Sequence, residues 1–324
     1  MGIVNPSGKL AESYPIAYTD VPSAGFYETG GKQAQYRESI YVGYRYYDAA
    51  QQEVLFPFGH GLSYTSFEYR DLEISCSELN PPYTLNISFS VKNTGGVDGA
   101  EVPQVYVGAV DSPVFRPEKE LKAFTKIHLK AGESKLVNLS LDARSFSIYD
   151  VQAGDWVVPS GKYQILVGAS SRDIRLQCEI KIQGREVEAN PGISDWYAHP
   201  TGTPTQSDFE SLLGRKIQPV IPWIKGKYTL ESSFNDMKDS FVIRRLIKSI
   251  EKRVGKAFGG ADYRNPTFKM MVSSSINTPV KNITQLSPES MPKHMAVGLI
   301  HLANGKVLKG ILAFIRKHKE SKNG

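Results

Sequence analysis

Apolar and polar residues alternate along the middle of the chain. Within residues 84–91 every second side chain is apolar, and the same period of two returns in two later runs. The alternating apolar positions are Leu85, Ile87, Phe89 and Val91, then Val137, Leu139 and Leu141, then Tyr163, Ile165 and Val167. Turn-forming residues separate the runs at 93–96, 131–134 and 159–161. We therefore predict a β-sandwich over residues 67–183, with about seven strands, which is the size of an immunoglobulin-like domain.

Helical spacing replaces this alternation toward the end of the chain, and we predict a helical C-terminal region over residues 237–324. One apolar stripe consists of Ile243, Leu246, Ile247, Ile250, Val254 and Phe258. A second helical stretch, from about 293 to 318, is broken near Asn304 and Gly305. Its apolar residues are Met295, Leu299, Leu302, Leu308, Ile311, Leu312 and Ile315. We expect both stripes to dock against domains absent from this chain, because exposed stripes would make it self-associate.

The other segments lack sustained periodicity. Residues 184–236 are rich in Pro, Gly, Ser and Thr, which predicts a linker or an extended wrapping arm. Residues 1–54 are rich in Gly, Pro, Ser and Tyr, and we expect no independent core there.

A dense aromatic stretch at 55–69 divides these regions; it reads LFPFGHGLSYTSFEY. Pro57 is incompatible with a central strand, and Gly59 and Gly61 give the backbone freedom on either side of His60. Its aromatic residues are too many for a solvated linker: Phe56, Phe58, Tyr64, Phe67 and Tyr69. The stretch is predicted to be a packed connection that leads directly into a strand.

This connection resembles the segment that joins the second domain of glycoside hydrolase family 3 enzymes, the β-glucosidases and their relatives, to their fibronectin type III-like domain. Other stretches agree in the same order: NPSGKLAESYP at 5–15, YRESIYVGYRYYD at 36–48 and RPEKELKAF at 116–124, followed by LDARSFSIYD and GDWVVPSGKYQILVGASS. The resemblance covers residues 1 to about 183, and the remainder looks like a C-terminal extension carried by some members. It implies that residues 1–66 are the remnant of an α/β sandwich domain with its connector, and that 67–183 form the fibronectin type III-like sandwich. The absence of the Cys, Trp, Cys arrangement of true immunoglobulin domains agrees with this variant.

Charge is distributed unevenly between the two halves. Residues 1–189 hold 18 Lys and Arg against 23 Asp and Glu, whereas residues 190–324 hold 21 against 10. A basic arm of this kind is typical of proteins that bind nucleic acid or a membrane surface. We favour instead a solvated basic face that meets an acidic partner domain, and we do not favour nucleic acid.

Cysteine content and hydropathy bear on the compartment. Two cysteines argue against a disulfide framework as the basis of the fold, and Cys178 belongs to an alternating apolar face that predicts a buried thiol. The first residues have no apolar signal-peptide core, which favours a cytoplasmic location and an internal start within a longer protein. No uncharged apolar stretch is long enough to span a membrane.

Retaining glycosidases need two carboxyl groups, a nucleophile and an acid/base, on either side of the scissile bond. In the family that this chain resembles, the nucleophile is an Asp at a strand end of a barrel, in a run similar to Ser-Asp-Trp. Ser194, Asp195 and Trp196 spell that tripeptide here, but Asn190, Pro191 and Gly192 precede it in place of an apolar strand. A barrel needs about 250 residues, more than remain after it. We therefore assign no catalytic residue in this chain.

Other candidates also have structural interpretations. His60 has no Ser, Cys or His partner at a suggestive spacing, and we interpret it as a hydrogen-bonded structural imidazole. Tyr41, Tyr44, Tyr46 and Tyr47 beside Arg45 could stack on a sugar, although we favour packing against the absent part of their domain. No phosphate loop, dinucleotide fingerprint or metal-ligand spacing is present, so neither a cofactor nor a metal is expected.

The resemblance implies a C-terminal part of a retaining β-glucosidase-like enzyme that hydrolyses terminal β-linked sugars. Its expected partners are the catalytic barrel and the α/β sandwich domain of that enzyme, through which alone it would meet carbohydrate. We expect the chain to be inactive by itself. The alternative is a stand-alone β-sandwich interaction module whose basic helices bind an acidic polymer or a membrane surface.

Overall fold

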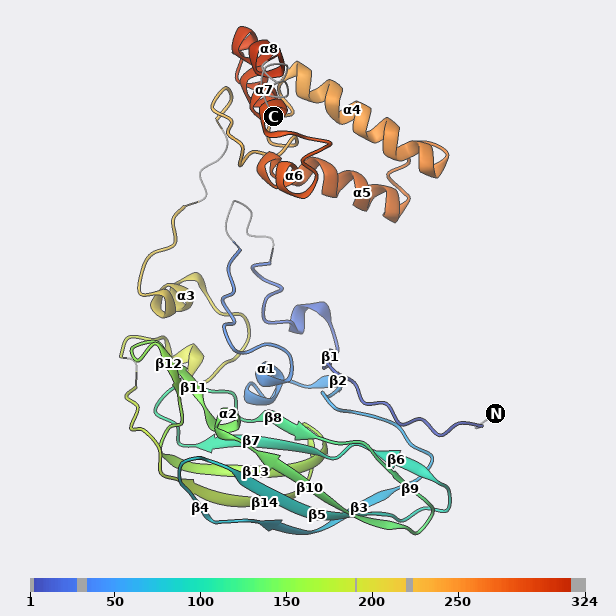
Figure 1. The fold of residues 1–324 in the computed structure, drawn as a ribbon, viewed down its shortest axis with the longest axis vertical. Helices are drawn as coiled ribbons and strands as arrows, with labels where there is room; N and C mark the ends of the chain where they lie inside the picture. Colours follow the sequence, from blue (N-terminus) through green and yellow to red (C-terminus); the bar gives the residue numbers. More distant parts are fainter. Residues whose placement is uncertain (1–2, 28–33, 190, 220–223, 316–324) are drawn as a thin grey trace, which may run out of the picture. The chain divides into compact units, whose positions relative to one another are not determined.

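The computed structural model describes residues 3–27, 34–189, 191–219 and 224–315, and it divides into two compact units, Met1–Pro219 and Val220–Gly324. The first unit is mainly β-structure and the second is helical (Figure 1). This confirms the predicted fold class. Among the described residues, no helix has the length and apolar character required to cross a membrane.

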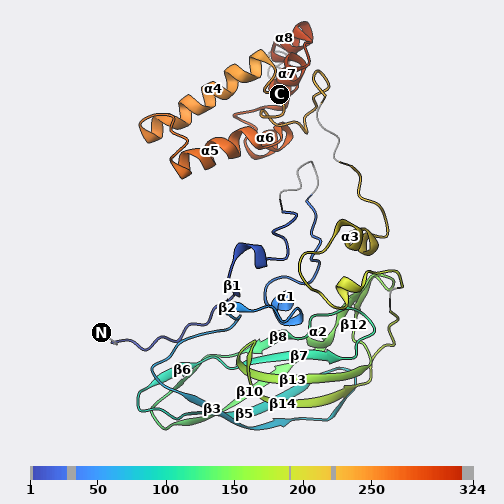
Figure 2. The ribbon, with the colours of Figure 1, turned by 180° about the vertical axis from the view of Figure 1, so that it is seen from behind.

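Two sheets packed face to face form the body of the first unit (Figures 1 and 2). The three-stranded sheet has the order β10-β5-β3, with β3 at Phe67–Ile74, β5 at Leu85–Asn93 and β10 at Ser134–Leu141. The five-stranded sheet has the order β4-β14-β13-β7-β8, formed by Glu78–Leu79, Asp173–Ile182, Gly161–Ser170, Gln104–Val110 and Glu120–Phe124. Two short strand pairs complete the sandwich. One joins β6 (Gly99–Glu101) to β9 (Ile127–Leu129), and the other joins β11 (Ile148–Asp150) to β12 (Asp155–Val157). The short helix α2 (Ala143–Phe146) precedes β11 in the chain.

The predicted alternation sets the pairing register of these sheets. Leu141 lies opposite Leu85, Leu139 opposite Ile87 and Val137 opposite Phe89, so that the apolar runs of β10 and β5 share one face. In the other sheet Ile165 lies opposite Val107 on one side and opposite Cys178 on the other. Because side chains alternate along a strand, these registers send both sets of apolar residues inward. The sandwich core is therefore made from residues of the 67–183 segment alone.

Cys178 is half-buried against this core, and burial raises the pKa of its thiol above the ordinary value. We predicted a buried thiol, and the structure shows Cys178 packed against the core but only partly covered. A thiol that keeps its proton is a poor nucleophile. Its role is packing.

The segments on either side of the sandwich lie along the sheet edge formed by β8 (Figures 1 and 2). Before it come β1 (Tyr14–Pro15), a 3₁₀ turn at Tyr18–Asp20, α1 (Tyr44–Ala49) and β2 (Val54–Phe56), with β1 and β2 paired. After it come a 3₁₀ turn at Asp195–Tyr197 and helix α3 (Gln206–Leu213). Helix α3 begins with a capping box in which Thr205 and Asp208 satisfy each other's backbone N–H groups.

Residues 224–315, the described part of the second unit, form five α-helices with a core of their own. These are α4 (Phe241–Gly255), followed by a 3₁₀ turn at Lys256–Phe258, α5 (Pro266–Asn277), α6 (Val280–Leu286), α7 (Lys293–Ala303) and α8 (Val307–Ile315). The break predicted near Asn304 and Gly305 separates α7 from α8. The tail after Ile315, to which we extended the second helical stretch, lies outside the described residues.

The expectation that the helical stripes stay exposed until another domain covers them is wrong for α4 and α7. Ile243 of α4 and Ile300 of α7 are buried in one cluster, together with Phe234 from the segment predicted as linker or arm and Met237 from the turn that follows it. Leu246, Ile247 and Ile250 of the predicted stripe pack against that cluster. The stripes are thus covered by the unit's own residues, and α8 alone of these two stretches keeps a largely exposed apolar face.

Replacement of Phe89 by Asp is expected to unfold the sandwich. Phe89 is 0% exposed in the core, and an unpaired buried carboxylate costs several kcal/mol against a total stability of about 5–15 kcal/mol. Hydrogen exchange of the full chain would show lost protection in 85–93, while 293–303 in the helical unit stays protected and serves as an internal reference. Asn86→Asp, on the exposed face of the same strand, is the matched control, and equal loss of protection in both variants would contradict the assigned register.

Candidate functional site

The connector at 55–69 is held by backbone hydrogen bonds to two other segments. The Gly59 N–H donates to the Leu10 carbonyl and the Leu10 N–H donates to the His60 carbonyl, both at 2.8 Å. The Ser171 N–H, in the turn between β13 and β14, donates to the Phe58 carbonyl at 2.9 Å. The connector is thereby fixed to the N-terminal segment on one side and to the sandwich on the other, as the predicted packed connection requires.

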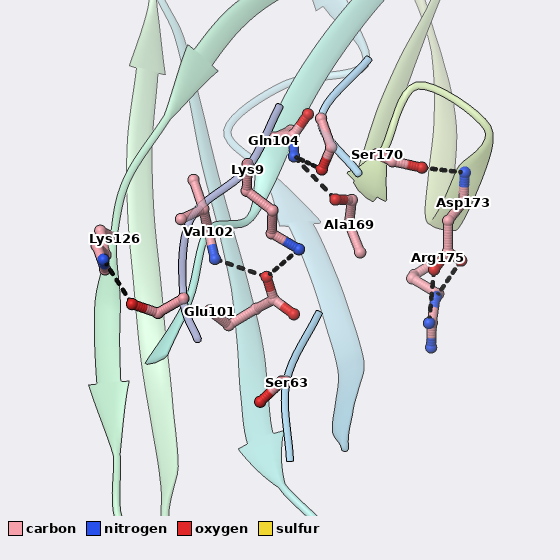
Figure 3. A network of polar contacts seen from close by, with 12 residues as sticks. Lys9, Ser63, Glu101, Val102, Gln104, Lys126, Ala169, Ser170, Asp173 and Arg175 are labelled. Carbon is pink, nitrogen blue, oxygen red and sulfur yellow. Dashed lines mark hydrogen bonds and ion pairs between the residues drawn. The ribbon is translucent and has the colours of Figure 1, made fainter. Parts of the chain in front are cut away.

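Gln104, at the start of β7, contacts the connector through its side-chain amide (Figure 3). Its Nε2 donates to the Gly59 carbonyl at 3.2 Å and to the Ala169 carbonyl at 2.8 Å, and its Oε1 accepts from the Tyr106 hydroxyl at 2.5 Å. Gly59 has φ of +80°, and a Cβ there would lie 2.1 Å from Oε1 of Gln104. Glycine is needed at this position for both its backbone conformation and the approach of the amide.

A buried carboxylate, Asp48 at the end of α1, meets cations from two loops of the sandwich. Nε of Arg172 lies 2.8 Å from Oδ1 of Asp48, and Nζ of Lys119 lies 3.2 Å from Oδ2. The Asp48 side chain is 4% exposed and that of Lys119 is 8% exposed. No donor in the described part of the chain points at Oδ2 with hydrogen-bond geometry, so the Lys119 contact is an ion pair rather than a hydrogen bond.

Arg172 extends this contact to the backbone. Its Nη2 donates to the Tyr47 carbonyl at 2.9 Å and to the Gln52 carbonyl at 2.7 Å, which closes the C-terminal end of α1. A guanidinium suits this position because its planar fork presents several donors at once.

A second ion pair fixes the N-terminal segment to the edge of the sandwich (Figure 3). Nζ of Lys9 lies 2.8 Å from Oε1 of Glu101, whose side chain is buried, and the same oxygen accepts from the Val102 N–H at 2.7 Å. Nζ of Lys126 donates to Oγ of Ser7 at 2.9 Å.

The tyrosines that we considered as a sugar-stacking surface are buried. Tyr41, Tyr46 and Tyr47 form a cluster with Tyr197, and partly buried Phe115 and Trp196 pack against it. The sugar-stacking hypothesis is therefore wrong for these three side chains, because no ring face is open. Their cover also differs from the absent domain that we favoured: it comes from the 193–212 segment of the same chain, which supplies Tyr197.

Hydrogen bonds engage the hydroxyl groups of Tyr41 and Tyr197 in this cluster. The Tyr41 hydroxyl donates to the Tyr197 carbonyl at 2.7 Å, and the Tyr197 hydroxyl donates to the Arg37 carbonyl at 2.8 Å. Burial raises the pKa of Tyr41 and that of Tyr197 to about 12 each. Tyr44 stands apart from the cluster: its ring stacks on Phe58 with 4.5 Å between centroids, and its oxygen accepts from the Leu121 N–H at 2.8 Å.

The two other sequence candidates have plain environments. The Asp195 side chain is 88% exposed on a 3₁₀ turn, where Oδ1 lies 3.1 Å from Nδ1 of His199. The His60 ring stacks on Phe56 with 5.2 Å between centroids. We expected a hydrogen-bonded imidazole, but among the described residues the ring shows this aromatic contact instead.

The chemistry that these groups support is structural. The buried carboxylates Asp48 and Glu101 are each paired with a lysine or arginine of the same chain. An open hollow of about 450 Å³ on the outer face of β3, β5 and β10 is lined by one carboxylate, Glu73, where glycoside hydrolysis uses a pair. Within the described residues, no group of three or more His, Cys, Asp or Glu side chains could hold a metal ion.

Sequence reasoning did not find the roles of Asp48, Lys119, Arg172 and Gln104. Gln104 does carry a local signal, because it is a polar residue at the start of an otherwise apolar strand. Its partners Gly59 and Ala169 are too distant in sequence to be identified from that signal.

Comparison with known proteins gives consistent matches for the first unit. Residues 101–171 match the fibronectin type III-like domain family. The thermostable β-glucosidase B of Acetivibrio thermocellus is 48% identical over 181 residues, which are 56% of this chain and 24% of that protein. An exo-α-(1→6)-L-arabinopyranosidase of Bifidobacterium breve is 41% identical over 206 residues, 62% of this chain and 27% of that protein.

A solved structure extends the match. The GH3 β-glucosidase of Bifidobacterium adolescentis superposes with a TM-score of 0.54 at 33% identity, and the match covers 76% of this chain and 31% of that one. This chain therefore spans about a quarter of the length of the curated relatives that it matches.

Neutralising Asp48 is expected to destabilise the first unit strongly. Asp48→Asn leaves Lys119 buried without its anion, and breaking a buried ion pair from one side costs about 3–5 kcal/mol. Glu118→Gln removes the other carboxylate near Lys119, at 3.4 Å, but that side chain is 57% exposed and the loss should be less than about 1 kcal/mol. Native-state hydrogen exchange of residues 44–60 in the full chain measures both, and similar losses in the two variants would contradict the role of Asp48.

Proposed function

The first half of this chain has the sequence and the fold of the C-terminal part of glycoside hydrolase family 3 enzymes, including their fibronectin type III-like domain, and from that premise we propose that it completes a retaining glycosidase rather than carrying out catalysis itself. The proposed reaction of the complete enzyme is hydrolysis of a terminal β-linked sugar. The nucleophile and the acid/base would come from residues outside this chain, in a barrel and in the main part of an α/β sandwich domain.

The exposed apolar surface of residues 1–66 is the observation that carries this proposal. Tyr18, Leu55 and Leu62 are among its members, each more than 60% exposed. The others with large exposed apolar side chains are Ile3, Val4, Tyr14, Ile16, Tyr27, Tyr36, Ile40, Val42, Phe56 and Tyr64. A monomer rarely leaves so much aromatic and aliphatic surface open in one segment, which supports a partner domain at this place.

The ion pairs of the site give this surface its proposed use. The Lys9–Glu101 pair, together with Asp48 and its partners Lys119 and Arg172, holds residues 1–60 against the sandwich through buried charges. The sandwich would then present those residues as a rigid docking element for the α/β sandwich domain. The sugar that the enzyme accepts would be set by the other domains, since matched relatives are named both for β-glucosides and for an arabinopyranoside.

A second candidate function rests on the charge of the helical unit. Residues 220–324 hold 19 Lys and Arg against 7 Asp and Glu. An interaction module that binds an anionic surface would use such a charge, with or without the glycosidase role.

Activity measurements test the main proposal. The purified chain is expected to release no chromophore from an aryl β-glucoside, and Asp195→Ala is expected to change nothing. Addition of the Acetivibrio thermocellus relative, truncated to remove the part that matches this chain, should give a complex with restored hydrolysis. Hydrolysis by this chain alone that Asp195→Ala abolishes would overturn the proposal.

Variants of the exposed surface sharpen this test. Tyr18→Ser with Leu55→Ser should weaken the complex at least about tenfold, because burial of each such side chain is worth about 1.5–3 kcal/mol. Leu136→Ser with Tyr149→Ser removes the same residue types from exposed positions on β10 and β11 and is the matched control. An equal effect of the two pairs would mean that residues 1–66 are not the docking element.

A further inference from the structure

Helix α8 exposes an aliphatic face that the rest of the helical unit leaves uncovered. Val307, Leu308, Ile311, Leu312 and Ile315 are between 47% and 78% exposed. Their spacing of i, i+1, i+4, i+5 and i+8 puts all five on one side of the helix. Five large aliphatic side chains on three turns form a continuous patch, unlike a scatter of single exposed residues.

The rotation of α8 about its own axis is fixed by close contacts with α7. A Cβ on Gly310 would lie 2.6 Å from Cδ2 of Leu302, and a Cβ on Gly298 would lie 2.8 Å from Cε2 of Phe314. The two helices therefore approach through glycines, with Phe314 and Gly310 on the inner side. With that side against α7, the aliphatic face has to point away from the unit.

Positive charge lies at the beginning of this face and elsewhere on the helical unit. Lys306 and Lys309 are exposed at its beginning. Helix α4 adds exposed cations to the same unit: Arg244, Arg245, Lys248, Lys252 and Arg253. In Figures 1 and 2, α4 and α8 lie toward one side of the helical unit and α5 and α6 toward the other.

The combination of aliphatic face and charge decides between possible occupants. A second copy of the unit would bring together two bodies with a net charge of +12 each, which opposes association. Nucleic acid would attract the cations through its phosphates and would stack its bases on aromatic side chains, but it would gain little from five aliphatic side chains. An anionic lipid surface fits both the aliphatic face and the positive charge, since acyl chains bury the apolar side chains while headgroup phosphates attract lysine and arginine.

We propose that α8 binds the surface of an anionic phospholipid bilayer, with its aliphatic face buried among the acyl chains and Lys306 and Lys309 at the level of the phosphates. The helix has nine residues and is about 13 Å long, well short of the roughly 30 Å hydrocarbon core, so it lies in the plane of the interface. This binding is independent of the proposed glycosidase role. It would bring the chain, and any enzyme that contains it, to a membrane surface.

Co-sedimentation of the full chain with lipid vesicles tests the proposal. The chain should partition to phosphatidylglycerol–phosphatidylcholine vesicles at low salt, more weakly at high salt, and not measurably to phosphatidylcholine alone. Leu308→Ser with Leu312→Ser should lower the partition coefficient at least about tenfold. Leu286→Ser with Met270→Ser removes exposed apolar side chains from α6 and α5 of the same unit and should leave partition unchanged. Both pairs lie on the surface, and circular dichroism confirms that each variant stays folded.

Several outcomes would overturn the proposal. These are no partition to anionic vesicles, equal partition of the two double variants, or a concentration-dependent dimer in sedimentation velocity that the Leu308→Ser, Leu312→Ser variant abolishes. Binding to poly-glutamate that is lost in the same variant would also overturn it, in favour of an acidic protein partner.

Discussion

The buried carboxylate of Asp48 is the constraint on which the arrangement of the N-terminal segment depends. A charge with 4% exposure has to be matched by opposite charge, because removal from water otherwise costs several kcal/mol. Lys119 and Arg172 supply that charge from two separate loops of the sandwich, so α1 can occupy only the place where both reach it. Once α1 is there, Tyr44 falls on Phe58 and the other tyrosines of 41–47 meet Tyr197. Packing of the aromatic residues thus follows from a polar contact.

The sandwich could be read from the sequence because the information that specifies it is local. An inward-facing strand repeats its apolar residues every two positions, and Leu85 and Ile87 display that period whatever lies opposite them. Helix α4 could be predicted for the same reason, because its apolar residues recur with the helical period of 3.6 residues. Helices α3 and α5 also left local signals that we did not use, namely the Thr205–Asp208 capping box and the Asn265–Pro266 start.

The site was less predictable because its contacts join residues far apart in the chain. Arg172 and Asp48 are 124 positions apart, and the Tyr41 hydroxyl bonds a carbonyl 156 positions away. Composition indicated that the tyrosines pack, but it could not identify the segment that covers them. The helical stripes were misjudged for a related reason: Phe234 and Met237 stand in a turn-rich stretch without periodicity, yet they form part of the core that buries α4.

The absence of a side chain at Gly59 has a mechanical consequence. The Gln104 amide occupies that space and donates to the Gly59 carbonyl of the connector and to the Ala169 carbonyl of β13. The backbone of Leu10, in the N-terminal segment, bonds the connector as well. A segment with glycines on both sides of a histidine would ordinarily be flexible, but here hydrogen bonds from Gln104, Leu10 and Ser171 restrain its backbone. A force applied to the sandwich would be transmitted through the connector to the β1–β2 pair, so that the two would rotate together.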